Sequence, residues 1–333
     1  MCTRWTKVIL APLRMTQPSW FVYNLNVARI SVVINTLNEE KNLPRALNSV
    51  KKLADEIIVV DMESTDKTCE IAKKFGAKVF LHKPTGYVEP ARNFAISKAT
   101  GDWILVLDAD EEVPLALSRE LREIPLRRDL ADFYRLPRKN IVFDKWLQHS
   151  RWWPDYNVRF FKKGAVVWLD TIHSVPHTEG EGADVPPEEE LAIIHYNYNS
   201  VSDYLTRMLR YTEVQAKDLA KKGYKFSWID LIQKPMGEFL SRFFAGEGYK
   251  DGVHGLVLAL LQAFSEMIVV VRVWEAQGFK NVGLGKTELD QTFAKAEYEL
   301  DYWMQQSRVR RYSLPQKFLR KLTLRDRRVS GSR

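Results

Sequence analysis

Two carboxylates separated by one small residue, Asp108 and Asp110 on either side of Ala109, follow the apolar run from Trp103 to Leu107. Five consecutive apolar residues are typical of a strand that is buried on both faces of a sheet. In open α/β sheets, ligands bind beyond the carboxyl ends of the strands. The spacing therefore predicts either a site for a divalent metal that carries a diphosphate, or an acidic turn at the start of a helix.

The chain before these carboxylates repeats a strand followed by a helix three times. Strands are predicted over residues 30–34, 56–61 and 78–81, and helices over residues 43–52, 68–75 and 91–99. Such alternation is typical of an α/β fold, a doubly wound, mostly parallel sheet with helices on both faces. The sequence therefore predicts a nucleotide-binding half domain over residues 28–112.

Polar residues follow each of the three earlier strands. They are Thr36, Asn38 and Glu39, then Asp61, Ser64 and Asp66, then Arg92 and Asn93. The carboxyl ends of parallel strands meet at one edge of a sheet, so this convergence favours the metal and diphosphate interpretation over the acidic turn. The sequence lacks the Gly-x-Gly-x-x-Gly fingerprint and the Gly-Lys-Ser/Thr phosphate loop. A nucleotide would therefore be held in another way.

Together these motifs resemble glycosyltransferase family 2. The residues that carry the resemblance are Val33 to Glu39, Asp61 with Ser64 and Asp66, Ala91 to Asn93, and Leu107 to Asp110. Residues 153–156, 159–161 and 195–196 are similar to bacterial enzymes of the lipopolysaccharide-core glucosyltransferase type. The resemblance covers about residues 28–200, and it implies a GT-A fold and an inverting enzyme with a nucleotide-sugar donor.

The resemblance also implies roles for single residues. Thr36, Asn38 and Glu39 would line the nucleoside pocket, Asp61 would accept from the base, and Arg92 would meet the diphosphate. Ser64, Asp66, Asn93 and Ala109 would complete the nucleotide-sugar pocket. Asp108 would hold the ribose or the metal, and Asp110 would bind Mg²⁺ or Mn²⁺. His195 is either a third metal ligand or a structural residue.

The acceptor half is predicted over residues 113–200. Trp152 and Trp153, with Arg159 and His173, are expected to bind the acceptor, although aromatic side chains also serve as core residues. Inversion needs a general base. Asp155 is the predicted base, and the alternative is that it pairs with Arg159. Relatives often have His-Glu where this chain has His173-Ser174, which makes Asp170 and His173 rival candidates for the base.

A helical region is predicted over residues 201–305. Its apolar stretch from Val253 to Trp274 is interrupted by Gln262, Ser265 and Glu266. We interpret it as a helix in the membrane interface, with a core helix or a spanning helix as alternatives. The basic tail, residues 306–333, has ten Lys and Arg residues and one acid from Arg308 onward. It suits anionic lipid headgroups, although a solvated tail or a nucleic-acid patch would have the same composition.

The composition is that of a globular protein with a net charge of +8. The two cysteines, Cys2 and Cys69, suit a reducing compartment, and no secretory signal is expected in the N-terminal extension, residues 1–27.

The sequence thus predicts a metal-dependent enzyme that moves a sugar from a nucleoside diphosphate, UDP by preference, to a lipid-linked glycan. It would work on the cytosolic face of the membrane as a peripheral or monotopic protein. A polyprenyl-phosphate glycosyltransferase and a non-catalytic nucleotide-sugar-binding module are the alternatives. Nucleic acid is not an expected partner, because the basic residues of the tail are not interleaved with aromatic residues on a recognisable module.

Overall fold

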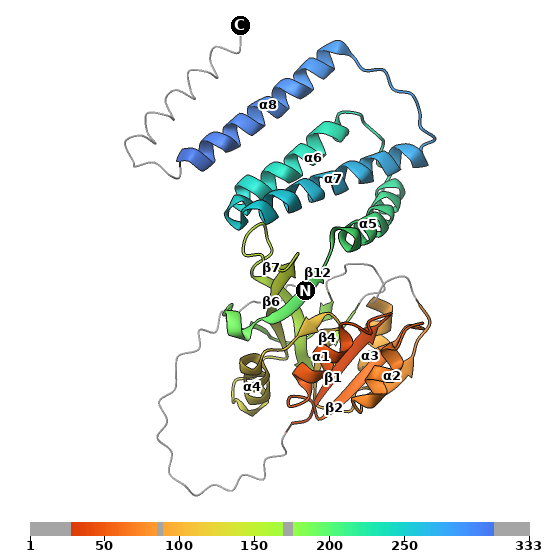
Figure 1. Cartoon of the computed structure of the whole chain (residues 1–333), viewed down its shortest axis with the longest axis vertical. Helices are drawn as coiled ribbons and strands as arrows, with labels where there is room; N and C mark the ends of the chain where they lie inside the picture. The colour runs from red at the N-terminus through yellow and green to blue at the C-terminus, as the bar shows by residue number, and fades with distance from the viewer. Residues whose placement is uncertain (1–27, 85–88, 169–175, 310–333) are drawn as a thin grey trace, which may run out of the picture. The chain divides into compact units, whose positions relative to one another are not determined.

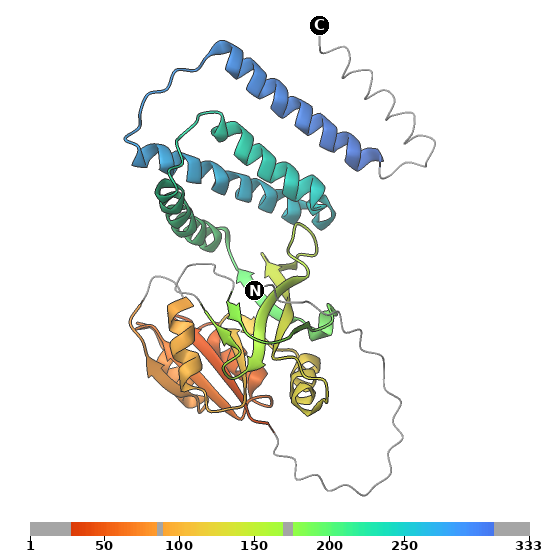
Figure 2. The ribbon, with the colours of Figure 1, turned by 180° about the vertical axis from the view of Figure 1, so that it is seen from behind.

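The computed structural model describes residues 28–84, 89–168 and 176–309. These residues divide into two compact units, one of residues up to 141 with 153–197 and one of residues 142–152 with those from 198 onward (Figures 1 and 2). We call them the sheet unit and the helical unit. The N-terminal extension, Asp170, His173 and the tail beyond residue 309 lie outside the described residues.

The sheet unit alternates strands and helices through its first half, as predicted. In chain order its elements are β1 (Ile30–Thr36), α1 (Leu43–Val50), β2 (Glu56–Asp61), α2 (Thr68–Lys74), β3 (Lys78–Leu81), α3 (Glu89–Lys98), β4 (Trp103–Asp108), β5 (Glu111–Glu112), α4 (Leu115–Glu123), η1 (Ile124–Leu126), β6 (Phe133–Val142), β8 (Asp155–Lys162), β9 (Val166–Val167), β10 (His177–Thr178), β11 (Gly182–Asp184), η2 (Glu189–Leu191) and β12 (Ile193–Tyr198).

The main sheet has the strand order β3-β2-β1-β4-β8-β6-β12-β5. Strands β1 to β4 run parallel, so that Val33 of β1 lies opposite Ile58 of β2 and Val106 of β4. Strand β8 pairs antiparallel with β4 and with β6. The chain winds outward from β1 to β3 and then returns to β4 on the other side of β1. The crevice at such a switch point lies at the carboxyl ends of β1 and β4, where ligands bind in this architecture.

Helices cover both faces of the sheet. On β1, Ile30, Val32 and Ile34 belong to one buried cluster with apolar residues of α1, α2 and α4, while Val33 belongs to a second cluster with residues of α3. This division follows the two-residue period of a strand. The predicted α/β fold, a doubly wound sheet followed by a helical region, is therefore confirmed, and its second half adds antiparallel strands to the parallel ones.

The helical unit holds β7 (Lys145–Trp146), α5 (Val201–Lys221), α6 (Asp230–Leu240), the π-helical turn η3 (Ser241–Ala245), η4 (Gly248–Asp251), α7 (Val253–Ala276) and α8 (Lys286–Val309). Residues 142–152, which the sequence placed in the acceptor half, group with this unit instead. The reason is Asp251, whose carboxylate accepts hydrogen bonds from the backbone N–H groups of Gln148 (3.3 Å) and His149 (3.0 Å).

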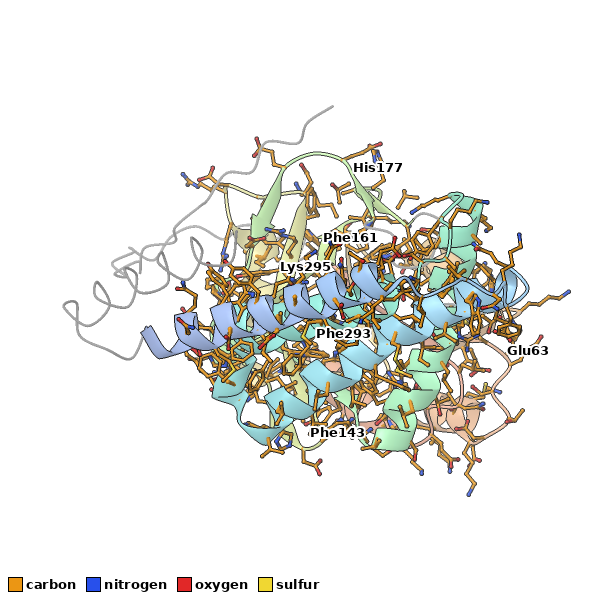
Figure 3. The ribbon with its side chains drawn as sticks, turned by 90° about the horizontal axis from the view of Figure 1, so that it is seen from above. Glu63, Phe143, Phe161, His177, Phe293 and Lys295 are labelled. Atoms are coloured by element: carbon orange, nitrogen blue, oxygen red, sulfur yellow. The ribbon has the colours of Figure 1, made fainter. Side chains whose placement is uncertain are left out.

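Helix α7 is the helix that, by length and composition alone and among the described residues, could cross a membrane. One side of it, which includes Leu258, Val270 and Val273, is buried. The other side exposes apolar residues at helical spacing, which we call the α7 stripe: Val253, Leu256, Leu260 and Phe264. Helix α8 exposes Phe293 in addition (Figure 3).

Glu56, at the start of β2, ties the amino ends of several elements together. Its buried carboxylate accepts hydrogen bonds from the hydroxyls of Ser31 and Thr100, and Lys78 Nζ lies 2.8 Å from it. Burial opposes the ionisation of this group, but the donors around it outweigh that effect and lower the pKa of Glu56 to about 2.

We expect the substitution Glu56→Gln to lower the free energy of unfolding by about 2 kcal/mol at neutral pH, because an amide N–H₂ would replace an acceptor that faces donors. The folded-state pKa lies below the ordinary 4.5, so the carboxylate stabilises the fold fully above pH 4.5 and loses this effect as the pH falls toward 2. In urea unfolding, the difference between the two proteins should therefore shrink across this window. A difference that stays constant would contradict the assignment.

Candidate active site

The turns after β1 and β2 are joined by hydrogen bonds around Asp61. Thr36 Oγ1 donates to Asp61 Oδ1 (3.1 Å), and the Ser64 N–H donates to Asp61 Oδ2 (2.9 Å). The Asn38 N–H in turn donates to Ser64 Oγ (2.7 Å). The structure thus brings these four predicted nucleotide-sugar residues together. Asp61 is buried, and it organises both turns in addition to any contact with a base.

The remaining residues of these turns have identifiable structural partners. Asn38 has a φ of 57°, a conformation that Asn tolerates, and its Oδ1 accepts from Thr65 N–H (2.8 Å). Glu39 N–H donates to Thr68 Oγ1 (2.8 Å). Asp66 accepts from the Thr68 N–H (2.9 Å) at the start of α2. Burial opposes the ionisation of Asp66, but the hydrogen bonds from Thr68 lower its pKa.

Arg92 and Asn93, at the start of α3, turn in different directions. Asn93 Nδ2 donates to the carbonyl of Trp168 (2.7 Å) and its Oδ1 accepts from the Trp168 N–H (2.9 Å). These bonds tie α3 to the segment after β9. Arg92 instead reaches Asp108, with 2.8 Å between its Nη2 and Oδ1. Of the two predicted ligand residues, Arg92 is therefore the one that joins the carboxylates.

A buried guanidinium lies between the carboxylates that follow β4. Arg159 of β8 is 2% exposed, and its Nη2 donates to Asp108 Oδ2 (2.6 Å) and to Glu111 Oε1 (2.7 Å). Glu111 Oε2 accepts from the Asp108 N–H (2.9 Å), which closes the turn around Ala109. The side chain of Ala109 packs in the core. We call Arg92, Asp108, Arg159 and Glu111 the strand-end cluster.

Asp108 and Arg159 hold each other in the charged state. Burial opposes the ionisation of Asp108, but Arg159 and Arg92 keep the pKa of its carboxyl well below the usual range. Burial likewise opposes the charge of Arg159, but Asp108 and Glu111 raise the pKa of the guanidinium. The Nε and Nη1 atoms of Arg159 are buried without a partner among the described residues.

Asp155, the predicted base, pairs with Arg138 rather than with Arg159. Arg138 of β6 lies directly opposite Asp155 of β8, and its Nη2 and Nε lie 2.6 and 3.0 Å from Asp155 Oδ2. Cross-strand neighbours are about 5 Å apart, whereas residues four apart along one strand are separated by about 13 Å. Burial opposes the ionisation of Asp155, but Arg138 and Asn140 lower its pKa.

His195 and Asp110 approach each other beside the strand-end cluster. Residue pairing between β12 and β5 sets His195 opposite Glu111. His195 Nε2 lies 3.7 Å from Asp110 Oδ2, and its Nδ1 lies 2.7 Å from Asn140 Oδ1. Both His195 and Asp110 are buried, at 7% and 9% exposed.

Asp110 and His195 fit a metal ion that takes its remaining ligands from the substrate and from water. Among the residues that the structure describes, no three His, Cys, Asp or Glu side chains form a metal-binding group. Asp108 is held by Arg92 and Arg159, so Asp110 and His195 are the members of the predicted metal set that lie together. Mg²⁺ typically uses one or two protein ligands and completes its coordination with substrate phosphates and water. The donor set suits such a cation.

The predicted acceptor residues are divided between the units. Trp152 belongs to the helical unit, where it packs against the buried cluster of Val142, Leu147 and Tyr204, while Trp153 belongs to the sheet unit. Arg159 lies in the strand-end cluster, and His173 lies outside the described residues. Their contact with an acceptor stays a prediction.

The sequence predicted no role for three residues of the site: Glu111, Arg138 and Asn140. Arg138 and Asn140 are two apart in β6, as Asp155 and Asn157 are in β8. Polar alternation in two neighbouring strands is a signal of a shared polar face. The pairing of the strands, which decides which residues meet, is not a local property of either sequence.

Comparisons with known proteins agree on one family. The model of glycosyl transferase family 2 matches residues 31–178. An uncharacterized glycosyltransferase of Rickettsia typhi is 34% identical over 255 residues, which are 74% of this chain and 87% of that protein. A lipopolysaccharide core biosynthesis glycosyltransferase of Rhizobium meliloti is 22% identical, over 75% of this chain and 94% of that protein.

Among solved structures, glucosyl-3-phosphoglycerate synthase from Mycobacterium tuberculosis is similar with a TM-score of 0.38 and 19% identity. The alignment covers 64% of this chain and 88% of that chain, in a crystal structure that contains Mn²⁺, UDP and glucosyl-3-phosphoglycerate.

We expect Arg159→Met to lower the free energy of unfolding by about 3–5 kcal/mol, because Asp108 and Glu111 would lose their buried counter-charge. Urea unfolding measures the change. Arg135→Met is the matched control: Arg135 makes a similarly short pair with Asp184, but both side chains are about a third exposed. The control should cost less than about 1 kcal/mol. Equal losses in the two variants would contradict a special role for the buried pair.

Proposed function

Because the chain belongs to glycosyl transferase family 2, we propose that it moves a sugar from a nucleoside diphosphate to a lipid-linked glycan on the cytosolic face of a membrane. Family membership makes it a glycosyltransferase with a GT-A fold. The observation that supports the donor assignment best is the strand-end cluster beside the Asp110–His195 pair, at the carboxyl ends of β1 and β4. UDP is the proposed nucleotide.

The donor is bound by the chain's own side chains in two places. Thr36, Asn38, Glu39 and Asp61, in the turns after β1 and β2, line the nucleoside pocket. Arg92 meets the diphosphate. Its side chain is 12% exposed, against 3% for Arg159, so it is the guanidinium of the cluster that can exchange Asp108 for a phosphate oxygen. Arg159 then keeps Asp108 in place.

Asp110 and His195 would hold Mg²⁺ or Mn²⁺ against the diphosphate. A cation bound there acts as a Lewis acid that neutralises the leaving group. The acceptor hydroxyl attacks the anomeric carbon from the opposite side, so the new oxygen–carbon bond forms as the bond to the β-phosphate breaks. The hydroxyl proton goes to a base, for which Asp155, Asp170 and His173 are the candidates. The pairing of Asp155 with Arg138 favours an orienting role for Asp155.

A polyprenyl-phosphate acceptor is a second candidate. Asp155 is held in the ionised form by Arg138 and Asn140, which makes its carboxylate a weak base. A phosphate acceptor is already anionic and needs no strong base. Mass spectrometry of the products made from membrane lipid extracts separates the two: a glycosylated polyprenyl phosphate supports the second candidate, and an extended glycan supports the first.

The helical unit supports a membrane-bound acceptor. The α7 stripe exposes four apolar residues at helical spacing, and a helix with one apolar face can lie in the interface of a bilayer. The similar protein of Rhizobium meliloti is named for lipopolysaccharide core biosynthesis, which also favours an acceptor on a lipid.

We expect Asp110→Asn to lower turnover of a UDP-sugar in the presence of Mn²⁺ by roughly 1,000-fold, since the cation would lose its carboxylate ligand and several kcal/mol of leaving-group stabilisation. Release of UDP measures this turnover across a panel of donors. Asp129→Asn, an exposed carboxylate of the same unit, should leave turnover unchanged. Full activity of the Asp110 variant with an unaltered need for Mn²⁺ would exclude the proposed metal site.

We expect Leu260→Glu/Phe264→Glu to weaken binding to anionic lipid vesicles by roughly 100-fold, because each apolar side chain contributes about 1.5 kcal/mol or more when buried. Co-sedimentation with the vesicles measures the effect. Leu115→Glu/Leu126→Glu is the matched control, since both leucines are exposed apolar residues of the sheet unit. If the two double variants bind vesicles equally, the α7 stripe does not face the membrane.

A further inference from the structure

Asp155 lies at one end of a series of hydrogen-bonded side chains in the sheet unit. As a carboxylate it can only accept hydrogen bonds. Its Oδ2 takes two N–H groups from Arg138, at 2.6 and 3.0 Å, and a third from Asn140 Nδ2 at 3.1 Å. A guanidinium is always charged in proteins, so the carboxylate opposite it is ionised and offers no proton of its own.

The next member, Asn140, is 1% exposed. An Asn side chain has a donor end, the N–H₂ group, and an acceptor end, the carbonyl oxygen. Because Asp155 only accepts, the N–H₂ group of Asn140 must face Asp155. Its Oδ1 must then face His195, where it lies 2.7 Å from Nδ1.

This orientation decides which nitrogen of His195 carries the proton. A carbonyl oxygen cannot donate, so Nδ1 must be the donor of the 2.7 Å bond. In a neutral imidazole the other nitrogen, Nε2, then carries a lone pair. Nε2 lies 3.7 Å from Asp110 Oδ2, so in the neutral ring an imidazole acceptor would be directed to a carboxylate in a buried position. A cation between them would relieve this arrangement.

We propose that Asn140 and Asp155 are positioning residues that fix His195 in the tautomer protonated at Nδ1, with Nε2 presented to the cation that Asp110 binds. The proposal deepens the proposed function, because the cation site is part of it. It assigns Asp155 an orienting role, and it gives Asn140 a role that extends beyond the stability of the fold. Hydrogen-bond partners of this kind typically change metal affinity by about 10–100-fold.

The tautomer can be measured without any metal. Nitrogen NMR of the full chain labelled with ¹⁵N-histidine distinguishes a protonated Nδ1 from a protonated Nε2, and the signal that disappears in His195→Gln belongs to His195. We expect the proton on Nδ1 at a pH where the ring is neutral. A proton on Nε2 overturns the proposal, whatever the protein does with metals or donors.

The affinity for Mn²⁺ tests the consequence. With UDP present, free Mn²⁺ is measured by electron paramagnetic resonance, and Asn140→Leu should bind the ion about 10–100-fold more weakly. Asn157→Leu is the matched control, because Asn157 Nδ2 also contacts Asp155 (3.2 Å to Oδ1), whereas the contact with His195 comes from Asn140. Its affinity should stay at the wild-type value. Equal losses in the two variants overturn the proposal, because a general disturbance around Asp155 would explain them.

The exchange Asn140→Asp/Asp155→Asn separates a positioning role from a structural one. A carboxylate at position 140 still accepts from Nδ1, and an amide at position 155 donates to that carboxylate. We expect the double variant to recover more than half of the binding free energy that Asn140→Leu loses, and no recovery overturns the proposal. If the wild-type protein with UDP does not bind Mn²⁺ at all, the proposed metal function fails, and the NMR measurement still decides the tautomer.

Discussion

The buried guanidinium of Arg159 is the constraint on which the site depends. Asp108 ends, and Glu111 follows, a strand whose other side chains are all buried, and carboxylates in such surroundings are strongly destabilised unless a cation meets them. Within the described strands β1 to β4, the one basic residue is Lys78, which pairs with Glu56 at the opposite end of the sheet. The antiparallel strand β8 supplies the cation instead, because its pairing with β4 brings Arg159 within 2.6 Å of Asp108. The second half of the sheet therefore supplies the cation that the buried carboxylates of the Asp-x-Asp turn require.

The same charges divide the site into two parts. Arg92, Arg159 and Arg138 carry three positive charges, and Asp108, Glu111, Asp110 and Asp155 carry four negative ones. The guanidiniums lie against Asp108, Glu111 and Asp155, and the imidazole of His195 lies 3.7 Å from Asp110. In the proposed function the cation lies beside Asp110 and His195, while Arg92 meets an anion. A metal-bound diphosphate presents both charges at once, which is why the proposed donor matches the arrangement.

The sequence predicted the strands and helices of the parallel half closely. It did not predict contacts between distant segments, and there are physical reasons for this difference. Strands such as Lys78–Leu81 and helices such as α1 follow from runs and periods of apolar residues, which are local signals. Asp155 was predicted as the base, with a pair to Arg159 as the alternative, because both residues lie on one face of one strand. The actual partner, Arg138, depends on the register between β6 and β8, which is set by contacts far apart in the chain. The position of residues 142–152 failed to follow from the sequence for the same reason, since Asp251 lies about 100 residues away from His149.

The amide at position 140 shows how the register between two strands determines the hydrogen bonds of the site. An aspartate there would set a second carboxylate within about 3 Å of Asp155, and like charges at that distance raise the pKa of one of the two groups. A leucine would fill similar space but would leave Asp155 and His195 without the group that joins them. A glutamine would add a methylene to a position that is 1% exposed, where overpacking costs about 1–3 kcal/mol. Asparagine is the residue that can donate to an ionised carboxylate at one end and accept from an imidazole at the other. Through it, the ion pair between Arg138 and Asp155 fixes the ring that faces Asp110, so the cross-strand register of β6 and β8 also determines the geometry of the candidate metal site.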